Sequence, residues 1–333
     1  MSYETVLKQR STKKHLYLFC SSLGLHYLCA RFNKSMEFKK IQLSDKPVFD
    51  RLLEANTFRA SECSFSNLYG WAHKFNTKFA VFNDFLLIKF TGITGKCSYL
   101  MPFGKGDLRA AIEALYEDCG CKRRFEMSGV TERMWQKIEE AMPDVFQKTP
   151  TPDSFDYIYM SEKLIHLAGK KLQSKRNHVN RFKKEHGWQY ISLNERPEMV
   201  TECKRMLSEW YDLNAATHDK SLCLDYITTM DFLNNFETLG LRGGAIFADE
   251  QVDAFSLGTR LTDDTFIVHV EKAFAKINGA YAIMNQQFAE HEAVNYMYVN
   301  REEDMGFESL KKAKMSYYPD ILLEKNLVKF KPD

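Results

Sequence analysis

The sequence has no excess of charge of either sign and no long apolar run. Its 46 Lys and Arg nearly balance 44 Asp and Glu, so the net charge of +2 gives no whole-protein signal for nucleic-acid binding. No apolar run reaches the ~20 residues that a membrane-spanning helix needs. The nearest candidate, residues 16–30, is interrupted by polar residues and is not followed by the small-residue cleavage site of a signal peptide.

The cysteines also lack the spacing of a metal site. The eight of them form no C-x-x-C pair, and Cys119 and Cys121 are too close in sequence for the usual zinc ligands. No Ser-His-Asp order or Walker loop is found either. Scattered cysteines in a long chain indicate a reducing compartment, so we expect a cytoplasmic protein without a metal or a structural disulfide.

What the sequence does contain is typical of a soluble globular protein. Hydrophobic residues make up 44% of the chain, including 25 Phe and 16 Tyr, and 333 residues are enough for two domains with separate cores. A strand, an N-cap and a helix follow one another from Met36 onward. We therefore treat residues 1–35 as a leader or a wrongly assigned start that lies outside the fold.

The two halves of the chain show the same order of elements. In the first half we expect strands at 38–43, 98–103 and 124–129, a hairpin at 79–91, and helices at 44–56, 65–75, 108–118 and 131–142. We expect the hairpin to turn at Asn83–Asp84, and Ser44, Asp107 and Thr131 to cap the helices that follow them. In the second half we expect helices at 169–186, 197–216, 280–293 and 307–315, a hairpin at 244–259, and strands at 265–272, 296–300 and within 321–330. A TPTPD turn at 149–153 is the best linker. This predicts a duplicated α/β (α+β) unit, divided into residues 36–154 and 155–333.

This order resembles the GNAT fold, the architecture of acyl-CoA N-acyltransferases. Over residues 36–333 the chain also resembles the phosphatidylglycerol lysyltransferase C-terminal domain family. The stretches that carry this resemblance are FRASECSFSNLYGW at 58–71, the segments 155–182, 239–258 and 282–291, HVEKA at 269–273, and the run that begins NREEDMGFESLKK at 300. The resemblance implies two tandem GNAT-like units, each a mixed, mostly antiparallel sheet flanked by helices. It also implies a relationship to enzymes that move an amino acid from aminoacyl-tRNA to an amine or hydroxyl of a lipid or peptide.

The donor substrate is open at this point. GNAT enzymes bind the CoA pyrophosphate where a Gly-rich loop enters a helix. The equivalent segment, AKINGAYAIM, has Lys276 and Gly279 in fitting positions, but the bulky Tyr281 stands where a small residue is expected. This favours aminoacyl-tRNA over acyl-CoA as the donor. The alternative is that this segment is a plain turn into a core helix and binds no donor.

The segment 170–185 is the most basic part of the chain, with seven Lys or Arg and one acid. Lys175, Arg176, Asn177 and Arg181 are candidates for contacts with the phosphates of tRNA or of an anionic phospholipid headgroup. The alternative is a solvated surface whose positive charge complements the C-terminal end of a helix.

Three carboxylates are crowded together at Glu302, Glu303 and Asp304, after a strand and before a helix. Repulsion between neighbouring carboxylates can raise the pKa of one of them toward the range of a general base. The same carboxylates could instead bind the α-ammonium of an amino acid. Acids in the first turn of a helix also favour its dipole, which is the structural alternative.

Glu271 ends an apolar strand and is a further candidate base or substrate ligand. Its structural alternative is a salt bridge with Lys272 or Arg242. The remaining candidates for substrate binding are Arg242, Asn285, Asn300, Arg301 and Tyr317, whereas we interpret His269 as a core histidine. The favoured function is aminoacyl transfer in the second unit. Acyl-CoA-dependent N-acetylation and a non-catalytic binding module are the alternatives.

Overall fold

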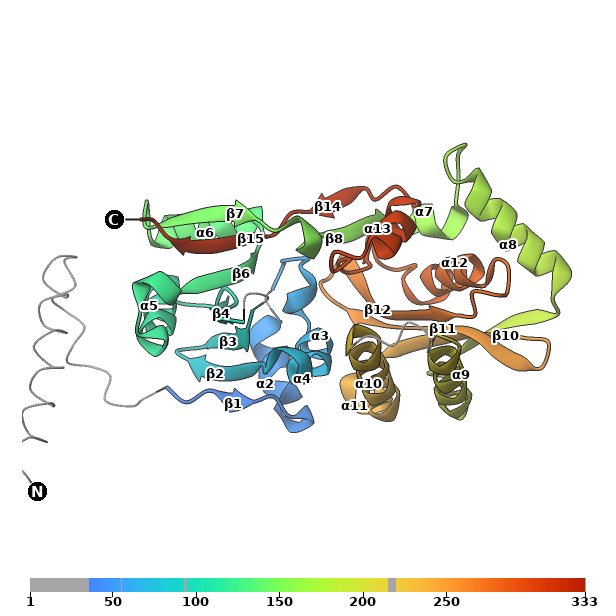
Figure 1. Ribbon diagram of the computed structural model, residues 1–333, viewed down its shortest axis with the longest axis horizontal. Helices are drawn as coiled ribbons and strands as arrows, with labels where there is room; N and C mark the ends of the chain where they lie inside the picture. Colours follow the sequence, from blue (N-terminus) through green and yellow to red (C-terminus); the bar gives the residue numbers. More distant parts are fainter. Residues whose placement is uncertain (1–35, 55, 93–94, 215–219, 333) are drawn as a thin grey trace, which may run out of the picture. The chain divides into compact units, whose positions relative to one another are not determined.

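The computed structural model of the protein describes residues 36–54, 56–92, 95–214 and 220–332. The predicted leader at 1–35 lies outside them. Residues 38–333 form one compact unit. Within the described residues this unit contains two β-sheets with helices against them (Figure 1), which confirms the mixed, mostly antiparallel architecture.

The first sheet has the strand order β1-β2-β3-β4-β6-β15-β7, with β5 paired to β3. Its strands are β1 (Lys39–Lys40), β2 (Lys78–Phe82), β3 (Phe85–Thr91), β4 (Cys97–Tyr99), β5 (Phe103–Gly104), β6 (Glu126–Val130), β7 (Phe146–Pro150) and β15 (Asn326–Phe330). The predicted hairpin is confirmed as β2 and β3. Asn83 and Asp84 both have positive φ, the conformation that a two-residue hairpin turn requires.

The helices of the first half begin and end close to their predicted positions, with two differences. They are η1 (Leu43–Asp45), α2 (Lys46–Leu53), η2 (Ser61–Cys63), α3 (Phe65–Gly70), α4 (Ala72–Phe75), α5 (Leu108–Cys119), η3 (Lys122–Arg124), α6 (Glu132–Ala141) and η4 (Pro152–Ser154). Asp107 caps α5 as predicted, because its carboxylate accepts from the Ala110 N–H at 3.1 Å. Asp45, and not Ser44, is the N-cap of α2. The helix expected at 65–75 is interrupted at Trp71.

The second sheet has the order β14-β8-β13-β12-β11-β10-β9. Its strands are β8 (Asp156–Met160), β9 (Trp188–Ser192), β10 (Arg242–Ala248), β11 (Gln251–Arg260), β12 (Thr265–Ala273), β13 (Tyr298–Asn300) and β14 (Ile321–Leu323). β12 and β13 are parallel and are paired only from Thr265–Tyr298 to Ile267–Asn300. Beyond these pairs β12 continues to Ala273 while β13 has ended, so this sheet opens next to residues 301–303.

Helices cover both faces of the second sheet (Figure 1). They are α7 (Ser161–His166), α8 (Gln173–Glu185), α9 (Met199–Leu213), α10 (Lys220–Asn234), α11 (Phe236–Leu239), α12 (Ala280–Glu292) and α13 (Glu308–Met315). α12 packs on β10, β11 and β12 and is itself covered by α7 and α8. The sequence interpretation missed α10. This helix contacts α3 of the first half, and Phe232 lies so close to Gly70 that a Cβ there would be 2.4 Å from its ring.

The last strand does not follow the predicted division at residue 154. β14 pairs with β8 in the second sheet, but β15 crosses to the first sheet and lies between β6 and β7. The physical reason is that β6 and β7 are not paired with each other, and β15 supplies hydrogen-bonding partners to both. The two halves are therefore joined by the C-terminal segment as well as by residues 151–155.

Candidate functional site

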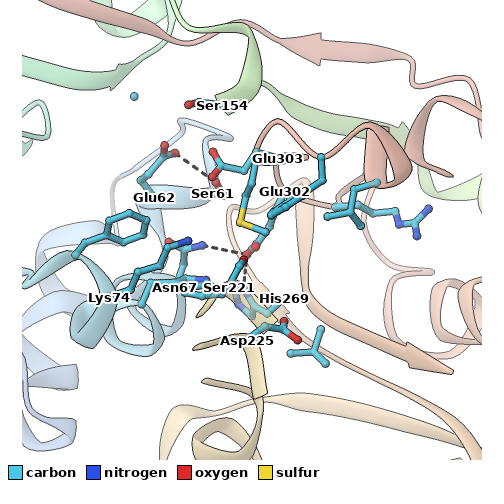
Figure 2. A pocket seen from close by; sticks show the side chains of 18 of the residues that line it. Ser61, Glu62, Asn67, Lys74, Ser154, Ser221, Asp225, His269, Glu302 and Glu303 are labelled. Carbon is cyan, nitrogen blue, oxygen red and sulfur yellow. Dashed lines mark hydrogen bonds and ion pairs between the residues drawn. The ribbon is translucent and has the colours of Figure 1, made fainter. Parts of the chain in front are cut away.

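A cavity of about 970 Å³ lies between the two sheets. Its walls come from both halves of the chain: α3, α4 and β6 on one side, and β12, α10, α13 and the loop before α13 on the other. Of the predicted catalytic residues, Glu271, Glu302 and Glu303 line it. Figure 2 shows Glu302 in the middle, with Glu62 and Glu303 above it and Lys74 and Asp225 below.

Glu302 is held by side chains from both halves. Its Oε1 accepts from Asn67 Nδ2 at 3.1 Å and lies 2.8 Å from His269 Nδ1, both drawn in Figure 2. The backbone N–H of Glu302 donates to Asn300 Oδ1 at 2.7 Å, and its φ is +56°. A non-glycine residue is held in this left-handed region only when its surroundings determine its conformation, and such residues cluster at functional sites. Asn67 lies 235 residues before Glu302, so this contact depends on the tertiary fold.

The His269 side chain is buried, as expected, but it belongs to the cavity wall. The register of β11 and β12 shifts here: Gly258 pairs with Val268 and Leu257 with Val270, which leaves His269 as the extra residue of a β-bulge. Its Nε2 lies 2.9 Å from Thr259 Oγ1. A carboxylate oxygen accepts hydrogen bonds, so Nδ1 is the donor when Glu302 is ionised.

Glu303 belongs to a buried charge cluster. The Lys325 ammonium is fully buried and lies 2.8 Å from carboxylate oxygens of both Asp156 and Glu62, and 4.0 Å from Glu303. Burial opposes the charge on Lys325, but the attraction of Asp156 and Glu62 outweighs it and raises its pKa. Burial raises the pKa of Glu303 to about 7, and the nearby Glu62 adds to the shift while Lys325 opposes it. Three carboxylates thus share one ammonium, and Glu303 lines the cavity.

Lys314 holds the backbone that presents these carboxylates. Its Nζ donates to the carbonyl oxygens of Arg301, Glu302 and Glu303 at 2.6, 3.1 and 2.5 Å. Burial, followed by repulsion from Arg301, lowers the pKa of Lys314 to about 8. The Glu302 carbonyl also accepts from the Tyr157 N–H at 3.2 Å. The ammonium therefore orders the loop by joining three successive carbonyls.

Glu271 lines the cavity but is already paired. Its two carboxylate oxygens accept from Arg301 Nη2 at 2.9 Å and from Asn285 Nδ2 at 3.1 Å. The partner is thus Arg301, and not Lys272 or Arg242 as the structural alternative supposed. The Arg301 guanidinium also lies 5.1 Å from the ring of Tyr317, which is buried. Four predicted residues thus lie together around a buried ion pair: Glu271, Asn285, Arg301 and Tyr317. Because both of its carboxylate oxygens are occupied, Glu271 has little capacity to act as a base.

Two predicted residues of the NREED run lie outside the cavity. Asp304 is 3% exposed and accepts from the Tyr157 hydroxyl and the Gly306 N–H. Asn300 is fully buried, and its Nδ2 donates to Asp156 at 3.0 Å. Both side chains shape the loop, whereas Glu302 and Glu303 face the cavity.

The basic helix α8 packs against α12 (Figure 1), and none of its residues lines the cavity. Lys175 points inward, with its Nζ 4.3 Å from the centre of the Tyr317 ring. Arg176 donates to the carbonyl oxygens of Leu167 and Gly169, which holds the start of the helix. Neither lines the cavity.

The other predicted anion ligands also have local roles. Arg181 forms an i,i+4 ion pair with Glu185 at 2.9 Å. Arg242 donates to the buried Glu292 at 2.7 Å. Asn177 is exposed on α8. All three lie outside the cavity, so the structure separates the α8 candidates from the carboxylates.

Five residues of the first half also line the cavity, although no functional residue is predicted there from the sequence: Ser61, Glu62, Asn67, Trp71 and Lys74. All but Lys74 belong to the polar run FRASECSFSNLYGW at 58–71, which carries part of the family resemblance. The polar side chains of this run are the sequence feature that could have indicated a binding site. No helix of the described residues is long and apolar enough to cross a membrane. Within the same residues, no group of three or more His, Cys, Asp or Glu is placed to hold a metal ion.

Comparison with known proteins agrees with this arrangement. The family described as phosphatidylglycerol lysyltransferase, C-terminal, matches residues 55–329. The chain belongs to this family. A conserved protein of unknown function from Bacteroides thetaiotaomicron has a similar structure, with a TM-score of 0.82 and 38% identity over 89% of this chain and 100% of that one. L-PGS from Bacillus licheniformis shares the fold, with a TM-score of 0.58 and 14% identity over 86% of this chain and 91% of that one.

One curated relative is an uncharacterized protein of Mycoplasmoides gallisepticum. It is 24% identical over 220 residues, which cover 66% of this chain and 66% of that protein. The chain thus spans about two thirds of the length of this relative. Family and fold together are those of a transferase domain.

Proposed function

We propose that the protein is an aminoacyltransferase that moves an amino acid from aminoacyl-tRNA to a hydroxyl or amine acceptor such as a phospholipid headgroup. The observation that carries the proposal is the pair Glu302 and Glu303. One carboxylate is held by His269 and Asn67, the other has a pKa of about 7, and both face the same large cavity.

Glu303 is the general base in this proposal. A base works best when its pKa lies near the working pH, and Glu303 meets this condition through burial. It takes the proton of the acceptor hydroxyl or amine as that atom attacks the carbonyl carbon of the aminoacyl ester. The bond between this carbon and the ribose oxygen of tRNA then breaks, and the proton held by Glu303 passes to the leaving oxygen.

Glu302 has the complementary role of binding the amino acid. Its carboxylate is oriented by Asn67 and His269, which suits an ammonium ligand. The nearby Glu62 lines the same end of the cavity. This excess of acids favours a cationic amino acid, in keeping with the lysyl group in the family's description.

The loop before α12 supports tRNA over acyl-CoA as the donor. In GNAT enzymes this helix N-terminus receives a pyrophosphate, but here α8 lies against it. A Cβ on Gly279 would be 2.5 Å from the carbonyl oxygen of His178, and His178 Nδ1 lies 2.9 Å from Asn278 Oδ1. A pyrophosphate at this loop would compete with α8 for the same space.

The outer surface of α8 offers a place for tRNA. Lys183 and Lys184 are exposed in its last turn, and Lys170 and Lys171 are exposed just before it begins. Such lysines contact phosphates without reading sequence, and their contribution falls as salt rises. In this proposal α8 holds the body of the tRNA, while the aminoacyl end reaches the cavity.

The direct test is transfer of radiolabelled lysine from lysyl-tRNA to vesicles that contain phosphatidylglycerol. We expect labelled lipid with the full-length protein, a loss of about 100-fold or more with Glu303→Gln, and no loss with the control Glu308→Gln, an exposed acid on α13. Transfer from acetyl-CoA but not from tRNA would favour the acyl-CoA alternative. Binding of both substrates without turnover by the wild-type protein would indicate a non-catalytic module.

A further inference from the structure

Lys74 differs from the other cations of the cavity. Among the described lining residues, Lys272 is paired with Asp225, Arg301 with Glu271, and Lys314 with three backbone carbonyls. Lys74 has no carboxylate within 4 Å and no hydrogen-bond partner in the described part of the chain. An ammonium group that lines a cavity without an anion has the capacity to bind one from a ligand.

Aromatic rings hold the Lys74 side chain in place. Its Nζ lies 5.0 Å from the centre of the Trp71 ring and 4.9 Å from that of Phe75. These contacts are cation–π interactions, which position an ammonium without neutralising its charge. Burial lowers the pKa of Lys74, while Glu303 and Asp225 oppose the shift.

The charges around Lys74 are of both signs. Lys272 and Asp225 compensate each other, and Lys272 Nζ lies 4.3 Å from the centre of the Trp210 ring. Lys74 therefore has no ion-pair partner within 4 Å among the described residues, although Glu303 and Asp225 attract it at longer range. Glu62, which is paired with Lys325, lines the cavity as well. The cavity thus presents both carboxylates and an unpaired ammonium to a ligand.

We propose that Lys74 binds a phosphate ester of one of the substrates. The inference rests on the proposed function: the amino acid binds at Glu302, and the phosphate that flanks the reacting group, on a small headgroup or a nucleotide, lies against Lys74. Lysine suits this role because its ammonium is a compact point charge with three donors. The structural alternative is that Lys74 only balances Glu303 and Asp225 at a distance, in which case removing it would leave phosphate binding unchanged.

The test is calorimetric binding of sn-glycerol 3-phosphate, adenosine 5′-monophosphate and inorganic phosphate to the full-length protein. We expect Lys74→Gln to weaken binding of a phosphate ester by about 10- to 100-fold. Lys74→Arg should keep most of the affinity. The matched control Lys40→Gln removes one exposed lysine on β1 and should change nothing. Equal binding by Lys74→Gln, equal weakening by Lys40→Gln, or binding of inorganic phosphate only would overturn the proposal.

The choice of ligands identifies the source of the phosphate. Binding of glycerol 3-phosphate alone assigns the site to a headgroup, and binding of the nucleotide alone assigns it to the RNA end. Both results support the site. Glu303→Gln separates this proposal from the proposed function, because it should abolish transfer without weakening phosphate binding. If the wild-type protein shows the Lys74 effect but no transfer, the anion site stands and the proposed function fails.

Discussion

Replacing Glu303 by Gln tests whether this carboxyl group is kept in the cavity at a cost to stability. Its pKa rises from 4.5 to about 7, chiefly because the carboxyl group, although part of the side chain faces the cavity, is largely removed from bulk water. An acid whose pKa is higher in the folded state binds more protons there than in the unfolded state. The free energy of unfolding should therefore fall as the pH rises from about 4.5 to about 7.

The magnitude follows from the size of the shift. A difference of about 2.5 pKa units corresponds to about 3 kcal/mol at pH 8. The Glu303 side chain keeps 30% of its surface exposed, and screening by water reduces this figure. We expect Glu303→Gln to be more stable than the wild type by about 1–3 kcal/mol at pH 8, and by less than about 1 kcal/mol at pH 5.

Urea unfolding at pH 5 and pH 8 measures this difference, with the exposed Glu308→Gln as control. The same variant should lose transfer, and the wild-type kcat/KM should rise with pH through about 7. We therefore expect a variant that is more stable than the wild type but inactive, because groups needed for function often lower the stability of the folded state. If Glu303→Gln shows the same fall in stability between the two pH values as the wild type, Glu303 is not the titrating group and our reasoning is wrong.

Three further changes test other parts of the site. His269→Gln should lower kcat by about 100-fold with a smaller effect on KM, because Glu302 loses its orientation. Steady-state kinetics would measure both constants, and equal changes in the two would contradict this prediction. Glu271→Gln should cost about 3 kcal/mol in urea unfolding, because the Arg301 guanidinium is left buried without a countercharge; a cost below about 1 kcal/mol would mean that the pair is dispensable. Gly279→Ala should cost more than about 2 kcal/mol, because φ is +90° and the new Cβ would meet a carbonyl of α8; an unchanged Tm would refute the close contact.

The sequence determined the local features of this protein. The Asn83–Asp84 turn, the Asp107 cap and the hairpin around Asp249 follow from residue types acting over two to four positions. All three are present in the structure. The crowding of carboxylates at 302–304 was also visible, because those residues are adjacent in the chain.

The tertiary structure decided which carboxylates face the cavity and which partners they have. Asn67 reaches Glu302 across 235 positions, and Lys325 reaches Ser61 across 264. A β-bulge turns His269 toward Glu302, and burial gives Glu303 its pKa of about 7. Local propensities act between neighbours along the chain, whereas burial and ion pairing depend on distances in space. For that reason the sequence alone indicated the acids, but only the folded chain showed that Glu271 is paired, that Asp304 is buried in the loop, and that Glu302 and Glu303 face the cavity.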